Sequence, residues 1–175
     1  MEKVVIKKIN GDIIFSYISK NNSMCKTILK YIEVCKKRGK IADFSYADFR
    51  GVDFSNVDFS HADFSNAIFI EVNFTNADFS NANFNNAIFI EVNFTNADFS
   101  NADFRYANFR RVDFSNADFN HADFRWANFN HANFSNADFS YADFYYTDFR
   151  WVDFSNADFS NTINFSMNKP DAIYY

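Results

Sequence analysis

Carboxylates are the side chains of this sequence that are most regularly placed to do chemistry. Six aspartates follow one another at intervals of 20 residues: Asp58, Asp78, Asp98, Asp118, Asp138 and Asp158. If the fold aligns them, they form an acidic column whose members repel one another, and we expect their pKa values to rise. A regular row of negative charge also resembles the outline of duplex DNA. The alternative is structural, since each carboxylate could accept a hydrogen bond from a backbone N–H group at a turn.

The other reactive residue types do not assemble into a catalytic or metal-binding set. His61 and His121 are 60 residues apart, and His131 falls at a different point of the pattern. The sequence has no glycine-rich phosphate loop after a strand and no nucleophile paired with a general base. We therefore expect no enzyme activity, no cofactor and no bound metal.

The element that must position the aspartates is set by phenylalanine, which stands at every fifth position from Phe44 to Phe159, 24 times in a row. Two residues before each Phe is Ala, Val or Thr, and the residue between them is almost always Asp or Asn. On an α-helix, successive Phe side chains would step 140° apart, and on a strand every second one would point to the wrong face. The period is satisfied if the chain turns a corner after each short extended segment, with Asn in the left-handed conformation that tight turns need.

The number of sides follows from an internal duplication. Residues 68–87 and 88–107 differ at only three places. A duplicated unit of 20 residues predicts that four five-residue sides make one square coil. Twenty-four repeats then make about six coils, a rod of roughly 29 Å at the spacing of neighbouring strands.

The tandem A-D-F-S-N pattern resembles the pentapeptide-repeat family. The resemblance covers about 120 of the 175 residues, although the uniform use of Phe and the single Gly51 at a corner depart from the family pattern. It implies an all-β solenoid, a right-handed quadrilateral β-helix. Some members of that family are DNA mimics that bind DNA gyrase or topoisomerase IV and protect it from quinolones.

Three segments are expected. Residues 1–40 predict an N-terminal β-hairpin and helix cap, with strands over 3–9 and 12–18 around a two-residue Asn10-Gly11 turn and a helix over about 23–38. Residues 41–161 form the β-helix, and residues 162–175 a C-terminal cap or tail, either a lid or a docking surface for a second copy. Cys25 and Cys35 lie too far apart on the helix to bridge and are expected to be reduced.

Two groups of outward side chains are candidate interaction surfaces. Four isoleucines replace polar residues on one face, and four aromatic residues gather at corners of the far half. These residues are Ile68, Ile70, Ile88, Ile90, Tyr106, Trp126, Tyr146 and Trp151. The isoleucines could be covered by the N-terminal hairpin, by a dimer partner or by a foreign protein, or could be an accident of the duplication. The aromatic residues suit an interaction hot spot, and stacking along the rod explains them equally well. A third set, Asn56, Asn76, Asn96, Asn116, Asn136 and Asn156, predicts a structural amide ladder.

Charge and composition limit the classes of function that the sequence supports. Residues 1–40 carry a net charge of +7 and residues 41–160 one of −12. The lysines suit a solvated surface better than nucleic-acid binding, and no apolar run is long enough for a membrane span or a signal peptide, so a cytoplasmic protein is expected. We predict a non-enzymatic rod that acts as a structural or protein–protein interaction module, with an unknown protein partner or a homodimer. The alternative is a gyrase-binding DNA mimic, although six coils span only about nine base pairs at roughly 3.4 Å each and four arginines interrupt one face.

Overall fold

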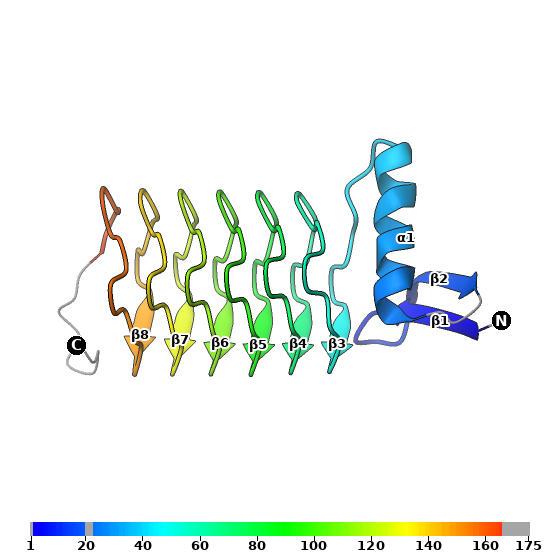
Figure 1. The fold of residues 1–175 in the computed structure, drawn as a ribbon, viewed down its shortest axis with the longest axis horizontal. Helices are drawn as coiled ribbons and strands as arrows, with labels where there is room; N and C mark the ends of the chain where they lie inside the picture. The colour runs from blue at the N-terminus through cyan, green and yellow to red at the C-terminus, as the bar shows by residue number, and fades with distance from the viewer. Residues whose placement is uncertain (1, 20–22, 166–175) are drawn as a thin grey trace.

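The repeat region forms a rod of stacked coils. The computed structural model describes residues 2–19 and 23–165 of the 175-residue chain. Along one side of the rod, six three-residue strands pair in parallel, each in register with the strand 20 residues later. They are β3 (Asp48–Arg50), β4 (Ile68–Ile70), β5 (Ile88–Ile90), β6 (Asn108–Arg110), β7 (Asn128–Asn130) and β8 (Asp148–Arg150). Figure 1 shows them side by side along the rod. The predicted coil of 20 residues is confirmed.

The other three sides of the coil are held by single-residue parallel bridges. Examples from each side are Asp43 with Asp63, Asp53 with Asn73, and Asp58 with Asp78. Four sides therefore repeat through six levels, linked by five steps of 20 residues. The architecture is a quadrilateral β-helix, as predicted.

Phenylalanine fills the interior of this rod. Phe94 shows the arrangement: its ring stacks on those of Phe74 and Phe114 at centroid distances of 5.1 Å and meets Phe99 edge-on at 4.9 Å. The rings from Phe44 to Phe139 are buried, with the small Ala or Val of each repeat beside them. Only at the far end are Phe154 and Phe159 partly exposed. Stacked and edge-to-face contacts of this kind add to the free energy gained by removing the rings from water.

The corner residue, two places after each Phe, takes the left-handed conformation with φ between about 52° and 63° at every level. The prediction for Asn is confirmed at positions such as Asn76 and Asn96. The same φ is also imposed on Glu71, Arg111 and Trp126, for which it is costly. The coil geometry therefore dictates the backbone, and the local residue does not.

At the N-terminal end, β1 (Glu2–Lys7) and β2 (Ile13–Ser19) form an antiparallel hairpin. The prediction of a two-residue turn is wrong. Lys8 N–H donates to Asp12 O, and Gly11 N–H donates to Lys8 O, which leaves a three-residue loop with Gly11 at φ +90°. Such a loop is a turn followed by a left-handed glycine. It frees Ile9 N–H to donate to Tyr46 O in the first coil at 2.7 Å.

Helix α1 (Met24–Lys37) stands across the end of the first coil (Figure 1). Ser23 caps it, accepting a hydrogen bond from Lys26 N–H. Its buried face carries Ile28, Ile32 and Cys35, which join the same apolar core as the phenylalanines. The ring of Tyr31 lies between Phe15 of the hairpin and Phe44 of the first coil, at 5.1 and 5.2 Å. The helix and hairpin thus cover the first layer of rings, and Cys25 and Cys35 are free thiols.

At the other end the repeat continues slightly past its sequence pattern. Ile163 bridges Asp143, and the ring of Phe165 stacks on Phe159 at 4.2 Å, although Phe165 comes one residue late. Residues 166–175 of the predicted tail over 162–175 lie outside the described residues. The division at residues 40 and 161 into cap, β-helix and tail stays a prediction.

Candidate interaction surface

The four sides of the rod are not equivalent, and the difference lies in one hydrogen bond. On three sides, the Asp or Asn before each Phe accepts a hydrogen bond through Oδ1 from the backbone N–H two residues later, as Asp43 does from Ser45. All 18 such positions make this bond. This outcome confirms the structural explanation of the aspartates, because the side chain satisfies a turn that would otherwise leave a donor unpaired.

The fourth side is the one made by β3–β8, which we call the strand face. Its outward residues are the first and third of each strand: positions 48, 68, 88, 108, 128 and 148, and positions 50, 70, 90, 110, 130 and 150. Its backbone is extended, and no equivalent Asp–turn bond occurs there within the part of the chain that the structure describes. An acceptor is therefore unnecessary before Phe69 and Phe89, and isoleucine replaces it.

The isoleucine patch, Ile68, Ile70, Ile88 and Ile90, lies in the middle of the strand face. Ile88 is 39% exposed and the other three are half-buried. Among the described residues, the N-terminal hairpin bonds to the first coil alone, through Ile9 with Tyr46 and Lys8 with Ala47. The suggestion that the hairpin folds over the patch is therefore wrong. What covers the patch otherwise stays open.

The strand face is bordered by two columns of corner residues. The entry corner, before each strand, holds Tyr46, Asn66, Asn86, Tyr106, Trp126 and Tyr146. The exit corner, after each strand, holds Gly51, Glu71, Glu91, Arg111, His131 and Trp151. The four predicted aromatic residues, Tyr106, Trp126, Tyr146 and Trp151, therefore lie on the border of the same face as the isoleucines.

The aromatic residues stack along the rod, which is one of the two explanations left open by the sequence. Trp126 lies 6.3 Å from Tyr106 and 4.4 Å from Tyr146, with the rings nearly parallel. At the exit corner, Trp151 stacks on His131 at 6.0 Å. These rings remain about half exposed, with Tyr146 at 63%. Stacking accounts for their geometry and leaves their edges open to a partner.

Arg105 and Arg125, beside this column, are held by acidic neighbours. Each donates to the Asp two residues before it, Asp103 or Asp123, at 2.6 Å from Nη2. Arg105 Nε also lies 3.7 Å from Asp123 in the next coil. These guanidinium groups are engaged within the rod and are less available to a partner than the rings.

The predicted rise in pKa is found at Asp118 and fails at Asp58 and Asp158, the two ends of the acidic column. Partial burial raises the pKa of Asp118, and the charges of Asp98 and Asp138 add to this effect. For Asp158 the prediction is wrong, because hydrogen bonds from the Ser160 hydroxyl and backbone lower its pKa. It is also wrong for Asp58. Burial raises the pKa of Asp58, but bonds from Lys36 and Ser60 outweigh burial and lower the pKa to about 2.

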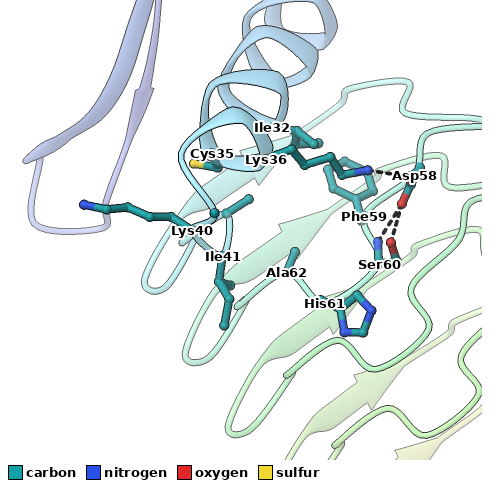
Figure 2. Close-up of a pocket in the computed structure, with 12 residues that line it drawn as sticks. Ile32, Cys35, Lys36, Lys40, Ile41, Asp58, Phe59, Ser60, His61 and Ala62 are labelled. Atoms are coloured by element: carbon teal, nitrogen blue, oxygen red, sulfur yellow. Dashed lines mark hydrogen bonds and ion pairs between the residues drawn. The ribbon is translucent and has the colours of Figure 1, made fainter.

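The amide ladder is observed where Asn76 donates to Asn56 Oδ1 and Asn96 donates to Asn76 Oδ1, both at 3.1 Å. A pocket of about 290 Å³ lies between α1 and the first coil. Lys36 crosses it to Asp58 Oδ2 at 2.6 Å, and Asp58 Oδ1 accepts from Ser60, as Figure 2 shows. The pocket lies along the contact between the cap and the rod, so we interpret it as a gap in their packing and not as a binding site.

Among the residues that the structure describes, His, Cys, Asp and Glu do not come together in any group of three or more that could hold a metal ion. Across residues 2–19 and 23–165, no helix is both long and apolar enough to span a membrane.

One signal of the unequal sides was missed in the sequence. The residue that follows the exit corner is Val at five of six levels: Val52, Val72, Val92, Val112 and Val152. On the other three sides it is almost always Ala. A β-branched residue favours extended backbone, which matches the open corner of the strand face.

The comparisons with known proteins agree with this β-helix of five-residue sides. A family model described as a pentapeptide repeat region matches residues 42–113, and a second, described as pentapeptide repeats, matches residues 117–156. The chain belongs to the pentapeptide-repeat family. A search of curated proteins gave no match.

Among solved structures, trypsin-treated QnrB1, described as a plasmid-mediated fluoroquinolone resistance protein, is 28% identical with a TM-score of 0.51. The match covers 66% of this chain and 64% of the QnrB1 chain. The pentapeptide repeat protein Rfr23 from Cyanothece 51142 is 16% identical over 66% and 86% of the two chains, with a TM-score of 0.35. HetL, a pentapeptide repeat protein from Nostoc sp. strain PCC 7120, is 14% identical over 78% and 93%, with a TM-score of 0.29. No catalytic family is indicated, and the fold is that of a structural repeat module.

Proposed function

We propose that this protein is a non-enzymatic rod in the cytosol whose strand face and bordering corners bind a protein. The observation that carries the proposal is the exposed side chains of one face. Ile88, Tyr106, Trp126, Tyr146 and Trp151 are all between 39% and 63% exposed, and nothing in the coil geometry requires apolar residues there. Aromatic and aliphatic side chains grouped on one surface are typical of protein interfaces.

The test is capture of a partner by a variant in which the aromatic column is replaced by the commonest corner residue, Tyr106→Asn, Trp126→Asn and Tyr146→Asn. Asn adopts the corner conformation, so the rod should fold unchanged. The matched control makes the same exchange at the neighbouring corner, one side away from the strand face, His121→Asn and Tyr141→Asn. A partner held by the wild type and the control, but lost from the aromatic variant, supports the proposal. Equal capture by all three proteins, or no specific capture, contradicts it.

A DNA-mimic role is the second candidate. It is supported by the column from Asp58 to Asp158 and by the likeness to QnrB1, since the family includes proteins that bind gyrase. The rod's short length and the arginines of its strand face weigh against it.

The mimic role is tested with gyrase supercoiling in the presence of wild-type protein and of the variant Asp98→Asn, Asp118→Asn. Asn retains the turn hydrogen bond, so only charge is removed. Inhibition by the wild type that weakens in the variant favours mimicry. No effect of the wild type at micromolar concentration excludes mimicry of that enzyme.

A further inference from the structure

The strand face is complementary to itself. We propose that two copies of this chain bind face to face through it, with the rods parallel and related by a two-fold axis along the rod. This proposal rests on the proposed protein-binding function and names its partner as a second copy. The pairing of residues between the two copies follows from the direction of this axis. Each level of one copy faces the same level of the other, and the column of position 48 faces the column of position 50 of the partner.

The apolar levels meet each other under this operation. Ile68 faces Ile70 of the second copy, and Ile88 faces Ile90, so four isoleucines from each chain form one central cluster. These side chains are the most apolar outward group on the strand face and are only partly buried in one chain. Removing them from water is the main expected gain.

The charged levels at both ends are also complementary. Asp48 faces Arg50 of the second copy, and Asp148 faces Arg150. Within one chain Arg50 already donates to Asp48 at 2.8 Å, and Arg150 Nε lies 3.3 Å from Asp148. Two such pairs brought together in opposite order make an alternating cluster of four charges, in which each charge has two opposite neighbours.

Polar and aromatic residues complete the match. Asn108 faces Arg110, and Asn128 faces Asn130, whose Oδ1 atoms are buried without a hydrogen-bond partner among the described residues. At the borders, entry corners face exit corners of the second copy. These corner pairs are Asn66–Glu71, Asn86–Glu91, Tyr106–Arg111, Trp126–His131 and Tyr146–Trp151. They are amide–carboxylate, aromatic–cation and aromatic–aromatic pairs, all of them favourable.

Gly51 fits the same arrangement. It is the one glycine at a coil corner, yet its φ of +58° is taken by non-glycine residues at the other corners, and a Cβ there would meet no atom within 4 Å. The left-handed φ favours glycine here, as it does at every corner, but does not explain why glycine occurs at this corner alone. In the dimer it faces Tyr46 of the second copy, where a side chain would compete with the ring for space.

An antiparallel dimer that also brought the isoleucines together would be less favourable. It would place Arg50 opposite Arg110 and Glu71 opposite Glu91, which are pairs of like charge. The strand face with its corners measures roughly 29 by 17 Å from strand spacing and rise. Two copies therefore bury about 1,000 Å², near the lower bound for a specific interface. We expect a reversible dimer whose population depends on concentration.

The first experiment measures mass by sedimentation equilibrium over a dilution series of the full chain. We expect a shift from 20.5 kDa to twice that mass as concentration rises. Ile68→Asp with Ile88→Asp should raise the dissociation constant by more than about tenfold, because it buries unpaired charge. The control, Thr75→Asp with Thr95→Asp on the adjacent side, should not change it. Circular dichroism checks that each variant folds.

The second experiment tests the parallel geometry by charge exchange. Chain one carries Asp48→Arg and Asp148→Arg, and chain two carries Arg50→Asp and Arg150→Asp. Alone, each places like charges opposite each other at both ends and should dimerise more weakly than the wild type. Mixed, they restore both clusters in a parallel dimer of matched levels, and not in the antiparallel dimer that brings the isoleucines together, where level one faces level four.

A wild-type protein that stays at one chain mass, or an isoleucine variant that still dimerises, overturns the proposal. A mixture no stronger than its components overturns the parallel geometry. A monomer that still captures a foreign protein through the aromatic column would refute the dimer and leave the proposed function intact.

Discussion

At the scale of single residues, the aspartates of this rod serve its turns first and its surface charge second. Oδ1 of each turn-forming Asp accepts a backbone N–H, which Asn does equally well at Asn73, Asn83 and Asn93. A negative charge at these positions is therefore required only where a second group, such as a lysine, binds the carboxylate. Asp58 is such a place, because its second oxygen accepts from Lys36 of the cap at 2.6 Å.

Asp58→Asn should therefore weaken the cap in a pH-dependent way. The pKa of Asp58 is about 2 in the folded protein, below the value of about 3.9 for an unfolded chain. The contribution of the Asp58 charge to the unfolding free energy is present above about pH 4 and is lost as the pH falls toward 2. The side chains of Lys36 and Asp58 are both more than half exposed, so we expect this contribution to be less than about 1 kcal/mol. Thermal melts of both proteins from pH 7 to pH 2 should converge at low pH.

Asp78→Asn is the matched control, since Asp78 makes the same turn bond to Ser80 one coil farther from α1. A gap between wild type and Asp58→Asn that is constant with pH would mean that the Lys36 pair contributes nothing.

At the scale of elements, one ring of the cap contacts both the hairpin and the first coil. Tyr31 of α1 packs between Phe15 and Phe44, and its hydroxyl donates to Asp43 O at 3.2 Å. Burial raises the pKa of this phenol to about 12. We expect Tyr31→Ala to cost about 2–4 kcal/mol of unfolding free energy, measured by denaturant titration. Tyr31→Phe, which keeps the ring and loses the hydrogen bond, should cost no more than about 1.5 kcal/mol. Equal losses of unfolding free energy in the two variants would mean that the hydrogen bond, and not the ring, stabilises the contact between cap and rod.

The ring stack makes a second prediction at this scale. Phe94→Ala should cost about 3–5 kcal/mol, because the ring is fully buried between two stacked neighbours and leaves a cavity. Phe159→Ala, at the partly exposed end, should cost less than half as much. Chemical denaturation gives both values. A Phe94→Ala cost below about 1 kcal/mol would be incompatible with the ring stack.

The elements also show how far sequence reasoning reaches. The period of Phe and the 20-residue duplication were enough to predict the square coil, because few backbone paths satisfy both. The strand face was not separated from the other sides, because Asp48 and Asp148 there look like the turn-forming aspartates and the column of valines after the exit corner was overlooked. The hairpin loop was misjudged because Ile9 bonds to Tyr46, a tertiary contact that the local Asn10-Gly11 signal does not contain. Stacking of the aromatic residues was one of two alternatives from the sequence, whereas the isoleucine patch and both corners became one surface only once their side was known.

At the scale of the whole molecule, the unequal sides mean that the stability of the rod depends on which residues lie on which side. Its stability depends less on how many complete coils it has. Deleting residues 68–87 removes one complete coil and returns every later residue to its own side. We expect this variant to fold, with a denaturant m-value lower by roughly one-eighth, in proportion to the surface lost. Deleting only residues 73–77 removes less of the core but rotates all later coils by a quarter-turn. Ile88 then occupies a turn position that needs an acceptor, and the Val column leaves the open corners. The five-residue deletion should therefore lose more unfolding free energy than the 20-residue deletion, measured by urea titration of both. If the shorter deletion proved the more stable, the four sides would be interchangeable, and a face that recognises itself would have no structural basis.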